Sequence, residues 1–240
     1  MRYVDAHVHL HEFDRESAAR FAEKFILIAV SDDYESSLKT LELAHALKVH
    51  PCVGVHPWEA HKVSDEEVAR TLKLLERGKV ASIGEVGLDK KFVPKTFERQ
   101  LEILRKFLKA AEELSLLVNL HAAGAWKEVL EELERHNIER AIFHWYTGPL
   151  SILEKIVEKG YMITVNPAVK IQNKMRKIVK EAPLSAILTE SDGPYNYRGI
   201  NLTPEMIPDT VKTIAQIKGL DQNTVAEKIH QNAKKILNKK

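Results

Sequence analysis

The chain has 240 residues, 44% of them hydrophobic and 29% charged, which is enough for a sizeable core in one large domain or two small ones. Its formal net charge of +2 gives no bulk signal for nucleic-acid binding, and its single cysteine, Cys52, excludes an internal disulfide. The first residues turn polar too early for a signal peptide, and no apolar run approaches the ~20 residues of a membrane span, so we expect a cytoplasmic protein without a membrane segment.

Short apolar runs alternate with longer amphipathic segments along the whole chain. Strands are predicted at 2–6, 25–30, 51–55, 80–84, 116–121, 140–144, 161–165 and 186–190. Helical segments are predicted at roughly 14–24, 34–48, 64–77, 94–115, 124–136, 149–159, 172–181 and 203–237. Ser64, three residues before Glu67, is typical of a helix N-cap, and Pro94 is typical of a first helical turn.

Eight strand–helix repeats without an intervening linker indicate a parallel sheet. At this length they predict an α/β fold, a (β/α)8 TIM barrel, with residues 1–240 forming a single domain. An open doubly wound sheet is the alternative, but no glycine-rich nucleotide-binding turn follows the first predicted strand.

Two histidines one residue apart, His7 and His9, stand at the end of the first predicted strand. Strand side chains alternate with a period of two, so both imidazoles are expected on the same face. Neutral imidazole is a common ligand of divalent transition metals. A His-x-His pair also occurs without metal, so the rest of the chain decides its meaning.

Further polar residues follow the later predicted strands at the same end. They are His56 after 51–55, Glu85 after 80–84, His121 at the end of 116–121, His144 at the end of 140–144 and Asp192 after 186–190. Barrel enzymes build their active sites at this end, so we expect these residues to converge. Taken singly, His121 or His144 could be a hydrogen-bonded histidine of the core, and Glu85 could form an ion pair with a lysine. Asp192 could stabilise a turn. Coincidence at successive strand ends is a poor explanation for all of them together.

Apart from His56, which also fits a turn before Pro57, four histidines and two carboxylates remain, and they exceed the ligands of one tetrahedral metal site with an open position. They suit two divalent ions, Zn, Mn, Mg or Fe, bridged by a carboxylate, and hydrolysis of a phosphodiester or carbonyl ester fits that arrangement. His11 lies near enough to this end to touch a substrate. Trp58, Trp126 and Trp145 also follow strands, where they could line a pocket or pack under loops.

The chain resembles the TatD family of metal-dependent deoxyribonucleases, within the amidohydrolase superfamily, over nearly its full length. The resemblance rests on Asp5-Ala6-His7-Val8-His9-Leu10, Gly54-Val55-His56-Pro57, Ile83-Gly84-Glu85-Val86-Gly87-Leu88-Asp89, Phe97-Glu98-Arg99-Gln100-Leu101, His121, His144 with Gly148, and Thr189-Glu190-Ser191-Asp192-Gly193-Pro194-Tyr195. It implies a two-metal hydrolase that acts on DNA or another phosphodiester or ester, with no obligate protein partner.

The resemblance also implies individual roles. His7, His9 and Asp192 would hold one ion, Glu85 would bridge, and the other ion would be held by the two remaining strand-end histidines, His121 and His144. Asp192, Glu85 and His56 would be the catalytic residues: Asp192 orients or deprotonates the attacking water, and His56 contacts the substrate.

The chain departs from the family pattern in three places. Ala123 stands where the family usually has an arginine that can bind phosphate, Trp145-Tyr146-Thr147 replaces a Cys-Phe-Ser, and His11 replaces an acidic residue. The missing arginine would be a bidentate phosphate donor, so nucleic-acid substrates are less certain than the metal chemistry. The alternatives are an ester, amide or lactone hydrolase or a D-aminoacyl-tRNA deacylase on the same site, and an inactive binding scaffold.

Overall fold

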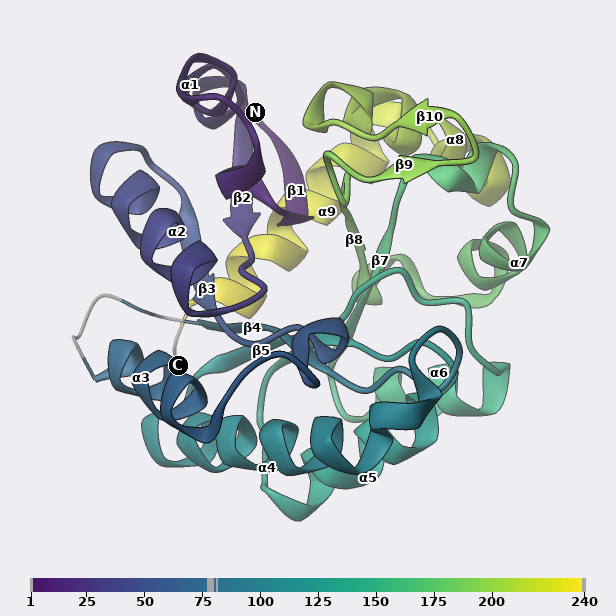
Figure 1. Ribbon diagram of the computed structural model, residues 1–240. Coiled ribbons are helices and arrows are strands. Elements are labelled where there is room, and N and C mark those ends of the chain that lie inside the picture. The colour runs from purple at the N-terminus through teal and green to yellow at the C-terminus, as the bar shows by residue number, and fades with distance from the viewer. Residues whose placement is uncertain (1, 77–79, 81, 239–240) are drawn as a thin grey trace.

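A computed structural model describes residues 2–76, 80 and 82–238. Its described part holds an eight-stranded sheet in which the strands pair in chain order, each parallel to the next (Figure 1). The strands are β1 (Tyr3–Val8), β2 (Phe25–Ala29), β3 (His50–Val53), β4 (Ser82–Gly87), β5 (Leu117–His121), β6 (Ala141–Phe143), β7 (Met162–Val165) and β8 (Ile187–Thr189). The prediction of a (β/α)8 barrel is confirmed.

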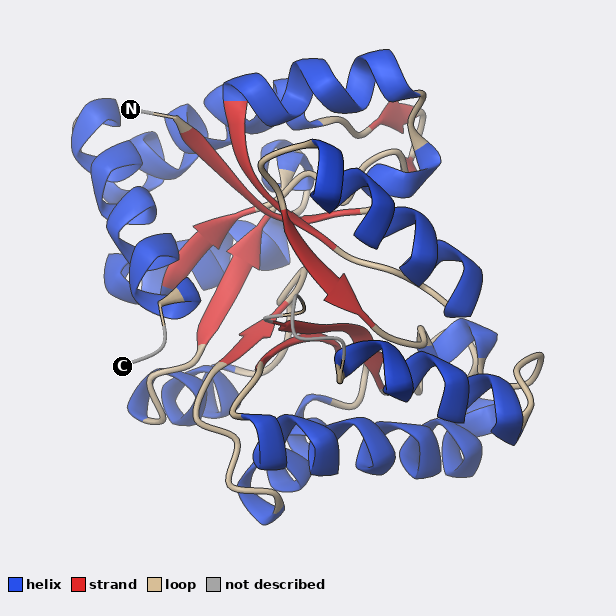
Figure 2. Ribbon diagram, turned by 90° about the vertical axis from the view of Figure 1, so that its left-hand side faces the viewer, coloured by secondary structure: helices blue, strands red, loops and turns tan. Residues whose placement is uncertain are grey.

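Helices surround the strands (Figure 2). They are α1 (Arg15–Lys24), α2 (Tyr34–Ala46), α3 (Asp65–Leu75), α4 (Phe97–Leu114), α5 (Trp126–Arg135), α6 (Leu150–Glu158), α7 (Asn173–Glu181), α8 (Ile207–Lys218) and α9 (Gln222–Leu237). Their apolar faces are buried: in α4 the buried side chains include Leu104, Leu108 and Ala111, which lie on one face at helical spacing.

The first and last strands meet and bring the two ends of the sheet together. The Thr189 hydroxyl donates to the Val4 carbonyl at 2.6 Å, and the Asp192 amide donates to the His7 carbonyl at 3.0 Å. Helices α8 and α9 pack against β1 and β8 at this junction. Residues from opposite ends of the chain are therefore neighbours at the C-terminal end of the barrel.

Close approach of β4 to β5 depends on glycine. A Cβ atom on Gly87 would lie 1.9 Å from the His121 carbonyl oxygen, and one on Gly84 would lie 2.8 Å from the Asn119 Cβ. These contacts leave no space for a side chain at either position. The glycines on either side of Glu85 thus let β4 carry this residue close against β5.

Of the two helix starts predicted from the sequence, one is confirmed and one is displaced. Ser64 is the N-cap of α3 and accepts a hydrogen bond from the Glu67 amide, whereas Pro94 starts a short 3-10 turn and α4 begins at Phe97. Residue 77 of the predicted helix 64–77 and residue 81 of the predicted strand 80–84 lie outside the described residues.

The prediction of one helical segment over 203–237 is wrong. Gly219 has a φ of 64° and ends α8, and the N-cap Asp221 then starts α9. The sequence analysis also missed a short hairpin, β9 (Asn196–Tyr197) with β10 (Ile200–Asn201), which follows Asp192. Glu85 lies within β4, because this strand continues to Gly87, beyond the predicted end at residue 84.

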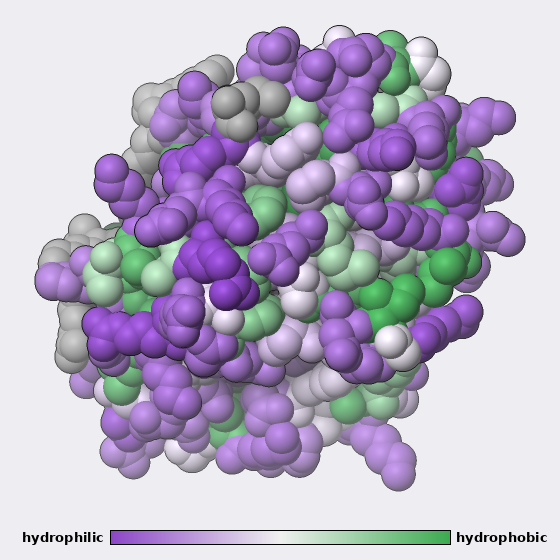
Figure 3. Space-filling view, turned by 90° about the horizontal axis from the view of Figure 1, so that it is seen from above, coloured by the Kyte–Doolittle hydropathy of each residue, from purple (hydrophilic) through white to green (hydrophobic). Residues whose placement is uncertain are grey.

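The surface seen from above is largely hydrophilic, with small hydrophobic areas between the polar side chains (Figure 3). Among the helices of the described residues, none has the length and apolar character needed to cross a membrane.

Candidate metal centre

The residues proposed from the sequence converge at one end of the barrel. His7 lies in β1, Glu85 in β4 and His121 at the end of β5. His9 follows β1, His56 follows β3, His144 follows β6 and Asp192 follows β8. These side chains approach one another closely, as the strand-end positions predict.

One half of the centre gathers around Oε2 of Glu85. The Nε2 atoms of His7 and His9 lie 3.1 Å and 3.5 Å from this oxygen. Both nitrogens also lie 3.5 Å from Oδ1 of Asp192. Two imidazole nitrogens and two carboxylate oxygens thus face a common point, a donor set suited to a divalent ion.

The other half gathers around Oε1 of the same Glu85 carboxylate. Nδ1 of His121 lies 2.9 Å from this oxygen, and Nε2 of His144 lies 3.1 Å from it. Nε2 of His56 is 3.3 Å from the same oxygen. Each carboxylate oxygen of Glu85 therefore faces a separate group of histidine nitrogens.

Oxygen acceptors fix the tautomers of His7 and His9. Asn119 donates its amide N–H to the Ala6 carbonyl at 2.8 Å, which turns its Oδ1 toward Nδ1 of His7 at 2.9 Å. Nδ1 of His9 lies 3.2 Å from Asp32. With the proton held on Nδ1 in both rings, the lone pairs on Nε2 point into the centre.

A carboxylate lies beside the outer ring nitrogen of both His121 and His144. Nε2 of His121 donates to Oδ2 of Asp89 at 2.9 Å, so its lone pair is on Nδ1, the atom that faces Glu85. Nδ1 of His144 lies 3.6 Å from Oε2 of Glu190, which is an ion-pair contact longer than a hydrogen bond. Such partners of a ligand histidine orient the ring and increase its basicity.

His56 differs from these four histidines. It is the N-cap of the 3-10 turn η2 (Pro57–Glu59), and its Nδ1 accepts the backbone N–H of Trp58 at 3.1 Å. The neutral ring must therefore carry its proton on Nε2, the atom that faces the centre. His56 is arranged as a hydrogen-bond donor and not as a metal ligand.

The charges of the centre and a buried ring nitrogen without a hydrogen-bond partner fit a bound cation. Burial alone would raise the pKa of Glu85, but the charges of His56, His144 and His7 outweigh burial and hold this pKa well below its ordinary range. The pKa of His9 is raised: burial would lower it, and Asp32, Asp192 and Glu85 overcome that effect. Within the described residues, the buried Nε2 of His7 has no hydrogen-bond partner. The donor set fits a metal that replaces these protons.

A cavity of about 710 Å³ opens above the centre. Trp58, Trp126 and Trp145 all line it, as one reading of the sequence allowed. Phe92 and Tyr195 are 58% and 46% exposed at its wall, and they follow β4 and β8, which lie on opposite sides of the barrel. The cavity is thus walled by aromatic rings, with the carboxylates and imidazoles of the centre at its base.

Sequence analysis missed the residues that hold the histidines. They are Asp32, Asp89, Asn119 and Glu190. A signal was present for two of them: Asn119 is two residues before His121 on the same strand face, and Asp32 closely follows a predicted strand. For Asp89, part of a motif already noted, only the fold shows the contact with His121.

Comparison with known proteins identifies the family of the chain. A model of the family "TatD related DNase" matches residues 4–238. Human deoxyribonuclease TATDN3 is 30% identical to this chain, in an alignment that covers 98% of this chain and 94% of the human protein. The uncharacterized metal-dependent hydrolase MJ1582 of Methanocaldococcus jannaschii is 26% identical, in an alignment that covers 100% of this chain and 98% of that protein. The crystal structure of YjjV, a TatD homologue from Escherichia coli, superposes with a TM-score of 0.89 at 26% identity, covering 100% of this chain and 99% of that one. The chain belongs to the TatD family of metal-dependent hydrolases.

Proposed function

We propose that this protein hydrolyses phosphodiester bonds in DNA with two divalent ions bound at the Glu85 centre. The observation that carries the proposal is the position of Glu85, whose two oxygens each face a different group of histidine nitrogens. A shared carboxylate is the usual bridge between two ions in hydrolases of this kind. His7, His9 and Asp192 would complete one site, and His121 with His144 would complete the other.

When bound, the ions would polarise the phosphoryl oxygen and provide a water of low pKa. The protein side chains have separate tasks. Asp192 lies at the edge of the cavity with its Oδ1 toward the centre, in position to orient the attacking water and accept its proton. His56 presents Nε2–H to the same space and would donate to a substrate oxygen.

The cavity supports a nucleic-acid substrate. Exposed aromatic rings such as Phe92 and Tyr195 offer stacking surfaces for unpaired bases. Lys39, Lys91 and Lys174 also line the cavity and bring positive charge to the path of a phosphate backbone. Two relatives named as deoxyribonucleases from human and zebrafish align over nearly all of this chain.

One observation favours a second candidate, hydrolysis of an ester or lactone, including a D-aminoacyl-tRNA ester. Ala122 and Ala123 form the cavity wall beyond His121, where the family usually places an arginine. This wall has no guanidinium to hold a phosphate in a bidentate contact, and its small apolar side chains suit a neutral group.

A side-by-side assay decides between these candidates. Wild-type protein and Glu85→Gln are reloaded with Zn²⁺, Mn²⁺ or Mg²⁺ and assayed on single-stranded and duplex DNA, a D-aminoacyl-tRNA and a lactone panel. DNA cleavage that requires metal and is lost in Glu85→Gln supports the nuclease. Metal-dependent cleavage of the tRNA ester or lactones alone favours the second candidate, and no turnover of any substrate favours a scaffold.

The single domain over 1–240 and the cytoplasmic location stay predictions.

A further inference from the structure

We propose a third divalent-cation site, separate from the Glu85 centre, formed by His11, Glu12 and Asp32. These residues are named here the outer cluster. The site goes beyond the proposed two-ion mechanism, and its ligand is a transition-metal cation such as Zn²⁺ that accepts imidazole and carboxylate together.

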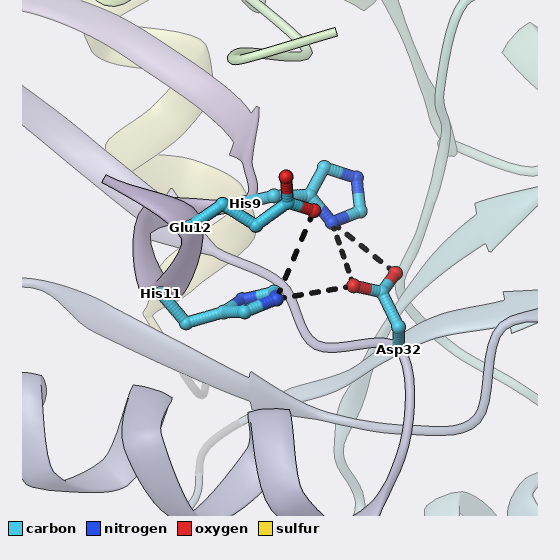
Figure 4. Close-up of side chains that lie close together, drawn as sticks. All are labelled: His9, His11, Glu12 and Asp32. Carbon is cyan, nitrogen blue, oxygen red and sulfur yellow. Dashed lines mark hydrogen bonds and ion pairs between the residues drawn. The ribbon is translucent and has the colours of Figure 1, made fainter. Parts of the chain in front are cut away.

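The geometry of the outer cluster fits one ion. Nε2 of His11 lies 3.1 Å from Oδ2 of Asp32 and 4.0 Å from Oε1 of Glu12 (Figure 4). Ligand atoms at the ~2.1 Å bond lengths of a tetrahedral zinc site lie roughly 3.4 Å from one another. The two separations bracket that value, and Glu12, which is half exposed, can close the longer gap by a small rotation.

His11 supplies an independent indication. Its side chain is only 7% exposed, so it is almost fully withdrawn from water. In the part of the chain that the structure describes, its Nδ1 has no hydrogen-bond partner. Without a metal, Nε2–H donates to Oδ2 of Asp32 at 3.1 Å. Among the described residues, no acceptor or donor holds the ring from the Nδ1 side, so a cation can replace the Nε2 proton, which leaves the Nε2 lone pair directed at the carboxylates. A cation between Nε2 and Asp32 gives that lone pair a partner.

Asp32 can serve both centres at once. Nδ1 of His9 lies 3.2 Å from both Oδ1 and Oδ2 of Asp32, while Nε2 of the same ring faces Glu85 (Figure 4). His9 thus remains a ligand of the inner centre through Nε2 and a donor to Asp32 through Nδ1. Because Oδ1 is equally near to His9, it can accept that N–H while Oδ2, 3.1 Å from Nε2 of His11, binds the cation.

The outer cluster belongs to the wall of the substrate cavity. His11, Glu12 and Asp32 all line this cavity, and the carboxylates of Asp33 and Glu35 lie on the same wall. A cation at this place would offset that negative charge and face the substrate. In a chain with Ala123 at the usual arginine position, it would give an anionic substrate a second point of attraction.

Metal content and position test the proposal. Protein stripped with a chelator is reloaded with saturating Zn²⁺, its stoichiometry is measured after gel filtration, and anomalous difference maps at the zinc edge locate the ions. We expect about three ions per chain in the wild type and about two in His11→Ala and Glu12→Gln, since each variant removes one ligand. His45→Ala, which alters an exposed histidine on α2, is the control and should retain the wild-type stoichiometry.

The outcomes are distinct. An anomalous peak between His11 and Asp32 that disappears in Glu12→Gln supports the site, and Glu12 is exposed enough for this variant to fold even if His11→Ala does not. No peak there at saturating Zn²⁺ means a His11–Asp32 hydrogen bond only and overturns the proposal. A third ion that persists in both variants overturns it too. Missing peaks beside Glu85 would refute the two-ion proposal and leave this one standing.

Discussion

Asp89→Asn is expected to weaken the binding of one of the two proposed ions without altering the fold. Oδ1 of Asp89 accepts the backbone N–H groups of Lys91 and Phe92 at 2.8 Å and 2.7 Å, so this position must stay an oxygen. The new NH2 group then takes the place of Oδ2, which accepts from Nε2 of His121 and from the Trp58 indole.

An NH2 group at this position forces His121 to accept through Nε2. The ring proton moves to Nδ1, the atom that would hold the ion beside Oε1 of Glu85. Loss of such a supporting partner typically costs 10–100-fold in metal affinity, which is about 1.4–2.8 kcal/mol. The site of His7, His9 and Asp192 does not use His121 and should keep its ion.

Competition with a fluorescent chelator measures both dissociation constants in wild type and Asp89→Asn. Trp58→Phe is the matched control, because it removes the indole donor to Asp89 and leaves the carboxylate in contact with His121. Equal weakening of both ions, or no weakening of either, would refute the reasoning that Asp89 acts through the tautomer of His121.

Further predictions concern the centre and its cavity. Glu85→Gln should abolish hydrolysis and lower metal occupancy, since a neutral amide bridges two cations poorly; most activity retained in a folded variant would remove the bridging role. Asp192→Asn should keep much of the metal and lose about two to four orders of magnitude in turnover, as expected for lost general-base assistance, and near-wild-type turnover would make Asp192 a turn residue. Metal affinity should fall as pH falls, beginning above pH 6.5. The reason is that surrounding carboxylates outweigh the effect of burial and raise the pKa of His9 and His144 above this ordinary value, so protons compete with the metal. Chelator titration across pH 5.5–8.5 checks this, and an affinity that does not change with pH would contradict it. Ala123→Arg should tighten DNA binding by roughly one to two orders of magnitude if the substrate is a phosphodiester, and binding measured by fluorescence anisotropy that does not improve would favour the ester or lactone.

Sequence reasoning found the barrel and its six proposed ligands because both depend on periodicity. In a parallel barrel the C-terminal ends of all strands lie at the same end of the molecule, so the sequence alone could predict that His7, Glu85 and Asp192 lie close together. Strand register then decides which side chains point inward, as the pairing of Gly87 with His121 illustrates. The resemblance to the TatD family is confirmed by the family model over residues 4–238.

Contacts between residues at the ends of different strands, or in the loops after them, could not be predicted from periodicity. The bond from His121 to Asp89 joins two strand ends, and the contact of His9 with Asp32 depends on where the turn before α2 lies. Nothing in the spacing distinguishes His56 from the ligand histidines, since its role follows from a single hydrogen bond with the Trp58 amide. The break at Gly219 was missed because the apolar period continues on both sides of it.

The measurement that tests the central claim most directly is hydrolysis followed during metal reloading. Chelator-stripped protein is titrated with Mn²⁺, and cleavage of a short single-stranded DNA is recorded together with metal content, with Glu85→Gln in parallel. The two-ion account predicts no cleavage without metal, a rise as the Glu85 centre fills, and no rise in Glu85→Gln. Full cleavage by the stripped protein, or equal cleavage by both proteins, would contradict it.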